Sequence, residues 1–178
     1  MAVDLGDRLR SAFRWTDPGD GSGYLVSNRS GWWRDPVILS GLGDALGDLF
    51  RSASPTVVVS PEVTGFLLGP LVGRALGAGF VEAYRAGVRR HIAEPMQWVK
   101  VPSDHRGDEQ LLGVREGLIR ATDRVLVVDD WAATGAQIRA LRDLLGSAYV
   151  GAAVIVDECP PAVAAELTIR GLLSGDDL

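Results

Sequence analysis

Residues 124–137 read RVLVVDDWAATGAQ, and this stretch decides the fold class of the chain. Its four apolar residues, Val125 to Val128, form a run without polar interruption, which is typical of a central strand in a parallel sheet buried on both faces. The run ends in two acids, Asp129 and Asp130, at the carboxyl end where open α/β sheets bind their ligands. The stretch therefore predicts an α/β fold with a functional site at this strand end.

The residues after the two acids have the composition of a phosphate-binding loop. Small side chains leave the backbone N–H groups accessible, one hydroxyl is present, and a helix predicted to begin near Ala136 would add its positive dipole end. A buried strand followed by a solvated Asp-Asp turn would explain the strand and acids alone. The phosphate hypothesis assigns binding to Ala132, Ala133, Thr134, Gly135, Ala136 and Gln137.

Composition indicates an ordinary globular protein. A length of 178 residues suits one domain with a real core and leaves little room for a second. The net charge of -5 gives no sign of nucleic acid or an anionic membrane as a partner. The single cysteine, Cys159, excludes an intrachain disulfide and a thiolate zinc site. Because Pro160 and Pro161 follow it, we interpret Cys159 as a small apolar residue closing a strand rather than as a nucleophile.

The N-terminus is acidic, with Asp4 and Asp7, where a signal peptide would be basic. No uncharged apolar run approaches the length of a membrane span. We therefore expect a cytoplasmic protein without membrane or nucleic-acid partners.

Apolar periodicity and turn residues predict strands alternating with helices, which favours βαβ units. Helices are expected over residues 4–14, from the N-cap Asp35 and Pro36 onward, over 66–76 and over 136–145, with a short one after Pro161. Strands are expected over 57–59, 80–84, 125–128 and 149–156, with extended pieces at 24–26 and 97–101 and a weak edge strand in the tail. The rest of residues 86–111 shows no periodicity, so we expect a functional or disordered loop there.

The stretch 124–137 resembles the phosphoribosyl pyrophosphate (PRPP) signature of type I phosphoribosyltransferases, in which an apolar strand leads into two acids, two variable residues and Thr-Gly. The resemblance implies a single α/β domain with a central, mostly parallel sheet flanked by helices and a small N-terminal hood. On this basis residues 1–34 form the N-terminal helix and hood, and residues 35–178 form the phosphoribosyltransferase core.

A second region, residues 60–80 with the sequence SPEVTGFLLGPLVGRALGAGF, looks like the pyrophosphate-loop region of adenine phosphoribosyltransferases. There too the loop is followed by Gly-Phe, then Gly-Pro, then a helix ending in Leu-Gly-x-Gly. With Asp35-Pro36 included, the similarity covers about residues 20–156, most of the chain.

The resemblance implies a role for each part of the site. Asp129 and Asp130 would bind the ribose hydroxyls, offset positive charge developing on the sugar, and hold Mg²⁺ through PRPP or water. Trp131, the residue after the acids, would pack against the base; an ordinary core role explains it equally well. The facing wall would come from Leu25 and Val26 of the hood. The pyrophosphate would lie against Glu62, Val63, Thr64, Gly65, Arg85 and Arg89.

Two positions depart from the family pattern. Relatives usually carry Arg or Lys where Thr64 stands, and the adenine enzymes carry Arg in the hood where we place Ser27. The string Lys100-Val-Pro-Ser-Asp-His105 resembles the catalytic loop of orotate phosphoribosyltransferases. Lys100 and His105 are therefore candidate catalytic residues that could neutralise pyrophosphate or act as a general acid, although a solvated loop is the simpler meaning.

The leading hypothesis is a Mg²⁺-dependent phosphoribosyltransferase that transfers the phosphoribosyl group of PRPP to a nucleobase or related heterocycle and releases pyrophosphate. Adenine is the leading single acceptor, and relatives suggest a homodimer. Three alternatives remain open: a PRPP-sensing regulator without turnover, a phosphoribosyltransferase of a specialised pathway, and another α/β nucleotide binder with a coincidental motif.

Overall fold

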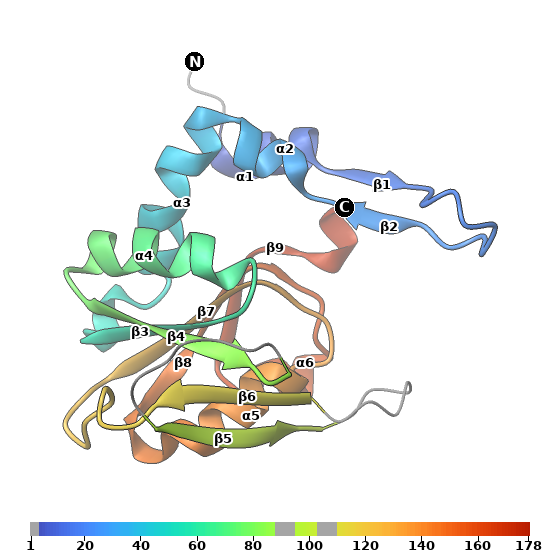
Figure 1. Cartoon of the computed structure of the whole chain (residues 1–178). Coiled ribbons are helices and arrows are strands. Elements are labelled where there is room, and N and C mark those ends of the chain that lie inside the picture. The colour runs from blue at the N-terminus through green and yellow to red at the C-terminus, as the bar shows by residue number, and fades with distance from the viewer. Residues whose placement is uncertain (1–3, 88–94, 103–109) are drawn as a thin grey trace.

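The apolar segments 57–59, 125–128 and 149–156 form the central strands of a seven-stranded sheet (Figure 1). The computed structural model describes residues 4–87, 95–102 and 110–178. Its strand order is β5-β6-β4-β3-β7-β8-β9, with β3 (Val57–Pro61), β4 (Gly79–Arg85), β5 (Met96–Val101), β6 (Gln110–Arg115), β7 (Val125–Ala132), β8 (Tyr149–Asp157) and β9 (Ile169–Ser174). Strands β4, β3, β7, β8 and β9 are parallel to one another. Beyond β4, strand β6 pairs antiparallel with β4, and β5 pairs antiparallel with β6. The sheet is mostly parallel, as the sequence predicts.

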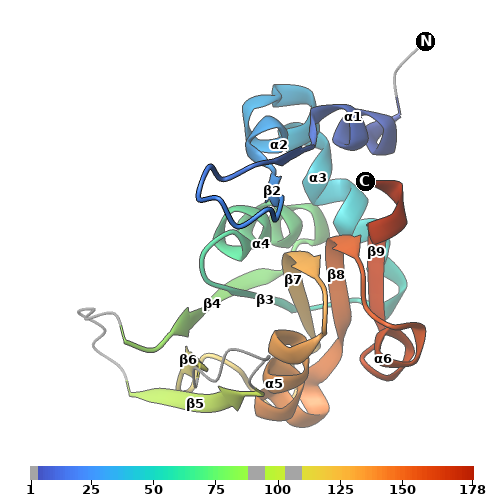
Figure 2. The same cartoon turned by 90° about the vertical axis from the view of Figure 1, so that its right-hand side faces the viewer.

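Helices cover both faces of the sheet, as Figures 1 and 2 show. One face carries α3 (Pro36–Asp48) and α4 (Gly65–Leu76); the other carries α5 (Ala136–Leu145) and α6 (Pro161–Glu166). Side chains of β7 alternate between the faces: Val125 and Val127 pack with Leu141 of α5, and Leu126 and Val128 pack with the α3 and α4 side. Burial on both faces explains the uninterrupted apolar run. In the described residues, three short 3-10 turns, η1 (Arg51–Ala53), η2 (Gly146–Ala148) and η3 (Gly175–Asp177), complete the helical elements.

The order of the parallel strands creates a place for a ligand. From β3 the chain crosses to β4 on one side, whereas β7 pairs with β3 on the other side, with Val59 opposite Val127. Strand order reverses at this point, and in open α/β sheets the crevice at the carboxyl ends of such strands is the usual binding site. Asp129 and Asp130 lie at that end of β7.

The N-terminal segment forms α1 (Leu5–Ala12), a two-stranded antiparallel ribbon of β1 (Arg14–Thr16) and β2 (Val26–Asn28), and α2 (Ser30–Arg34). Leu9 and Trp32 are buried in the same cluster as Leu126 of the sheet, and the Trp32 indole N–H donates to the Leu9 carbonyl at 2.8 Å. The segment therefore shares the main core, while its ribbon projects from the body of the molecule (Figure 1).

The helix start predicted at Asp35 is confirmed. Asp35 accepts hydrogen bonds from the backbone N–H groups of Val37 (2.8 Å) and Ile38 (3.4 Å), and Pro36 occupies the first helical position. Gly77 also ends α4 as expected, because it adopts a φ of 68°, which favours glycine.

One element contradicts the expected pattern and another is additional to it. Residues 110–115 form β6, although the sequence predicts a loop up to residue 111. Gly113 interrupts the apolar pattern of this strand. A Cβ at Gly113 would lie 2.4 Å from Cε3 of Trp98 on β5, so the glycine permits close packing rather than marking a turn. Residues 30–34, for which the sequence predicts no element, form α2, with Trp32 buried and Trp33 against it.

Candidate active site

The two acids at the end of β7 differ in their surroundings. Asp129 is buried and accepts a hydrogen bond from the backbone N–H of Asp130 at 2.9 Å. Burial, and then the neighbouring charge of Asp130, raise the pKa of the Asp129 carboxyl well above its ordinary value. A nearby cation would lower this pKa again, because an opposite charge favours the ionised carboxylate.

Asp130 is paired with a cation from the N-terminal segment. The Arg29 guanidinium, between β2 and α2, donates to the Asp130 carboxylate although 101 residues separate the two in sequence. The Asp130 side chain is only 7% exposed, and Arg29 is 31% exposed. Ser27 stands where the family resemblance implies a hood arginine. Arg29, two positions later, has no local signal that predicts its role, because only the tertiary fold brings it to Asp130.

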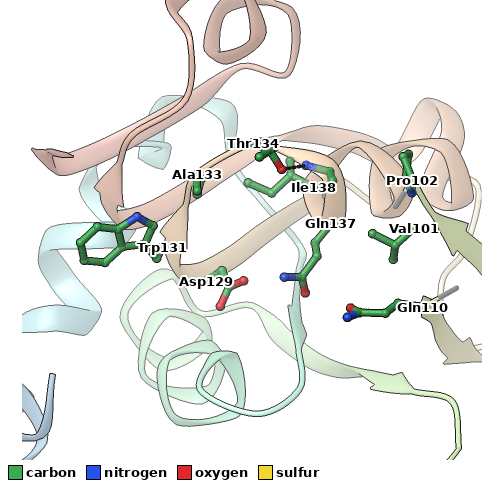
Figure 3. Close-up of a pocket in the computed structure, with 12 residues that line it drawn as sticks. Val101, Pro102, Gln110, Asp129, Trp131, Ala133, Thr134, Gln137 and Ile138 are labelled. Atoms are coloured by element: carbon green, nitrogen blue, oxygen red, sulfur yellow. Dashed lines mark hydrogen bonds between the residues drawn. The ribbon is translucent and has the colours of Figure 1, made fainter. Parts of the chain in front are cut away.

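The phosphate-loop residues line a pocket of about 190 Å³ (Figure 3). Gly135 adopts a φ of 73°, which allows the chain to turn sharply from β7 into α5. The Thr134 hydroxyl accepts from the Ala136 backbone N–H at 3.3 Å. The structure brings together all six residues assigned to phosphate binding, with Asp129, Trp131 and Ile138; the other lining residues are Val101, Pro102 and Gln110.

Trp131 both borders this pocket and packs against the N-terminal segment. Its ring centroid lies 5.9 Å from that of Phe13 and 6.2 Å from that of Trp15. Its indole N–H donates to the Glu158 carboxylate at 2.8 Å, which fixes the ring. Trp131 therefore packs against the N-terminal segment and also lines the pocket; its contact with a base stays a prediction.

Arg85 lies at the end of β4, next to the pyrophosphate-loop residues. Its Nε donates to the Glu62 carbonyl at 3.0 Å, and its own backbone N–H donates to the Glu62 carboxylate at 3.0 Å. Its two terminal nitrogens donate to Gln110 (2.9 Å) and Gln137 (3.1 Å), which both line the pocket. The guanidinium therefore connects the loop after β3 with the loop after β7.

The loop after β3 begins at the same edge of the sheet. The Glu62 backbone N–H donates to the Ala83 carbonyl at 2.9 Å, and the Glu62–Val63 peptide is cis. Thr64 and Gly65 lead directly into α4, where a Cβ at Gly65 would lie 3.3 Å from the Val128 carbonyl oxygen. These residues are neighbours of the β7 end without lining the pocket itself.

Other predicted site residues lie farther from the pocket. Leu25 and Val26 are 58% and 48% exposed, and neither lines it. Lys100 on β5 is exposed, while Val101, which points to the opposite side of the strand, contributes to the pocket wall. Arg89 and His105 lie outside the described residues. Burial raises the pKa of the Cys159 thiol to about 11, which favours its structural role.

The two acids are the only predicted metal contacts. Within the described residues, no three His, Cys, Asp or Glu side chains gather as a metal-binding group. Mg²⁺ commonly binds through one or two carboxylates while substrate phosphates and water complete its shell, so Asp129 and Asp130 fit a metal that arrives with its substrate. Across the same described residues, no helix has the length and hydropathy of a membrane span.

Solved structures of adenine phosphoribosyltransferases share this fold. The enzyme from Rhodothermus marinus has a TM-score of 0.78 at 23% identity, with 96% of this chain and 98% of that chain covered. The enzyme from Trypanosoma brucei, solved with AMP, pyrophosphate and ribose-5-phosphate, has a TM-score of 0.81 at 20% identity, with 98% of this chain and 81% of that chain covered. The sheet order and the pocket after β7 thus define a type I phosphoribosyltransferase fold.

Relatives identified by sequence show which family with this fold the chain belongs to. The adenine phosphoribosyltransferase of Synechococcus sp. is 30% identical over 171 residues, which cover 96% of this chain and 90% of the relative. That of Myxococcus xanthus is 34% identical over 155 residues, covering 85% and 79%. No protein-family model matches the chain. The chain belongs to the adenine phosphoribosyltransferase family.

Proposed function

We propose that this protein transfers the 5-phosphoribosyl group of PRPP to adenine or a closely related heterocycle and releases pyrophosphate. The observation that carries the proposal is the pocket formed by residues 132–138 immediately after Asp129 and Asp130, at the carboxyl ends of the parallel strands. Small residues, the Thr134 hydroxyl and the N-terminus of α5 suit a phosphate group, and two adjacent acids suit the ribose beside it. The family membership supports the same reaction.

The reacting sugar would lie between these groups. As a ring nitrogen of the acceptor displaces pyrophosphate, positive charge develops on the sugar, and the Asp129 and Asp130 carboxylates stabilise it. Both acids also suit Mg²⁺ bound through PRPP or water, and the metal when bound supplies charge neutralisation for the pyrophosphate. Glu62, Val63, Thr64 and Gly65 form the surface proposed for pyrophosphate, with Arg89, Lys100 and His105 as further candidates.

The proposed acceptor site lies against Trp131. A ring held by Glu158 and backed by Phe13 is a rigid aromatic surface for a flat heterocycle. Leu25 and Val26, on or beside β2, would form the facing wall if the ribbon bends toward the pocket once the base is bound. We also propose a cytoplasmic homodimer; exposed Leu39 of α3 and Leu67 of α4 support an apolar contact between copies.

With PRPP, Mg²⁺ and adenine, the protein is expected to form AMP and release one pyrophosphate per AMP, as measured by mass spectrometry and a coupled pyrophosphate assay. A panel of purines, pyrimidines and other heterocycles run in parallel identifies the acceptor. Turnover with a different heterocycle only would support the specialised-pathway alternative. Tight PRPP binding without turnover across the panel would contradict the enzyme and favour the PRPP-sensing alternative.

Replacing Trp131 with Ala should raise the KM for the base about tenfold or more while changing the KM for PRPP little, because stacking on an aromatic ring contributes roughly 1–3 kcal/mol per base. Steady-state kinetics with each substrate varied separately measures the two constants. Trp98→Ala is the matched control, since Trp98 is an exposed tryptophan on β5 outside the pocket lining. Equal changes in both KM values would assign Trp131 a structural role instead.

A further inference from the structure

The Arg85 side chain contacts two glutamines that line the pocket, and its charge also acts on Asp129 in the same lining. Its terminal nitrogens donate to Oε1 of Gln110 and Oε1 of Gln137, while Nε is engaged by the Glu62 carbonyl. Gln110, Gln137 and Asp129 line the pocket, whereas Arg85 does not. Figure 3 shows Gln137 and Gln110 extending from different elements toward one another and toward the space beside Asp129.

The chemistry of the groups fixes how each amide is turned. A guanidinium has N–H donors and no acceptor, so the amide atom that faces it must be the oxygen. The amide nitrogen of each glutamine, with its two N–H donors, is then directed away from Arg85. Without the guanidinium the amide could rotate by half a turn and present its oxygen to the pocket, which would repel an anion.

We propose that Arg85 is a positioning residue that holds Gln137, with Gln110 beside it, so that their amide N–H groups donate to the 5′-phosphate of the ligand. Arg85 then acts on the phosphate through the glutamines, in contrast to the direct contact with pyrophosphate that sequence comparison assigns to it. The 5′-phosphate is the anion concerned because Gln137 ends the run 132–137 that encloses the pocket. This inference rests on the proposed function, since it takes PRPP as the ligand.

A double-mutant cycle separates the indirect role from a direct contact. Arg85→Met and Gln137→Met should each weaken binding of Mg²⁺–PRPP about tenfold to a hundredfold, the loss that follows from removing a hydrogen bond to a charged group. The double variant should bind about as weakly as the weaker single variant, because both changes remove one interaction. Isothermal titration calorimetry measures each Kd. If the two losses multiply, Arg85 contacts the ligand independently and the inference is wrong.

Further variants test the direction of the amide and the identity of the anion. Gln137→Glu keeps an acceptor for Arg85 and loses the N–H donors, so it should weaken PRPP binding at least as much as Gln137→Met while thermal unfolding shows the fold retained. Gln137→Met should leave the Kd for pyrophosphate alone unchanged and weaken binding of ribose 5-phosphate. The reverse pattern would overturn the assignment to the 5′-phosphate.

Controls distinguish this inference from the proposed function. Arg142→Met removes another arginine, one that pairs with Glu166 and Asp143 on the outer side of α5, and it should bind PRPP as the wild type does. A wild type that does not bind PRPP would refute the proposed function. If the wild type and the Gln137→Met variant bind PRPP with equal affinity, the proposed function stands. Only the role of Arg85 and Gln137 would then be refuted.

Discussion

Asp130→Asn is expected to lower kcat by about two to three orders of magnitude, the usual effect of removing one group that stabilises charge in a transition state. Asn has nearly the same shape and can still accept hydrogen bonds from ribose, but it lacks the negative charge that opposes the positive charge on the sugar. The KM for PRPP should change much less than kcat. Initial rates of AMP formation at saturating PRPP and base give the comparison.

The control for this prediction is a second Asp→Asn change away from the site. Asp143 lies on α5, is exposed and pairs with Arg142, so Asp143→Asn should retain wild-type turnover. Asp130→Asn also leaves Arg29 without its counter-charge, and a modest loss of stability is expected from that. If Asp130→Asn unfolds the protein, or if its activity falls only in proportion to the folded fraction, the catalytic role assigned to Asp130 is wrong.

The parts of the site that the sequence predicts are encoded within short stretches of chain. Val125 to Val128 form a strand because every side chain is buried on one face or the other, and the two acids follow at the strand end. Gly135 is required by the turn into α5, where φ is positive. Local pattern and local backbone geometry agree in this stretch, so the strand, the acids and the phosphate loop could be predicted together.

The parts that the sequence does not predict depend on contacts between distant residues. Arg29 contacts Asp130 from the N-terminal segment, and Glu158, directly after β8, holds Trp131. Gln110 belongs to β6, whose alternation is interrupted by Gly113. None of these residues has a local pattern that distinguishes it from an ordinary surface side chain. Ser27 occupies the position where the resemblance implies a cation, whereas the fold brings Arg29 to Asp130.

Asp129→Asn should abolish most activity and at the same time stabilise the protein near pH 8 by about 0.5–2 kcal/mol, a gain typical of a single stabilising substitution. Wild-type Asp129 is costly when ionised because it is buried beside Asp130. Asn removes this charge, and its side-chain oxygen can keep the hydrogen bond from the Asp130 backbone N–H. If the charge of Asp129 serves catalysis but destabilises the folded protein, its removal should lower activity and raise stability.

The pH dependence tests the cause of this stabilisation. The pKa of Asp129 is higher in the folded than in the unfolded protein, so the folded state binds more protons over the range between the two values. Stability contributed by the protonated carboxyl is therefore present below the unfolded pKa, about 4, and is lost as pH rises through the folded pKa. Urea unfolding should show Asp129→Asn and wild type nearly equal near pH 4 and diverging toward pH 8, with Asp143→Asn showing no comparable divergence. An Asp129→Asn variant less stable than wild type at pH 8 would mean that contacts in the folded protein stabilise the ionised Asp129. The prediction that this charge destabilises the folded protein would then be wrong.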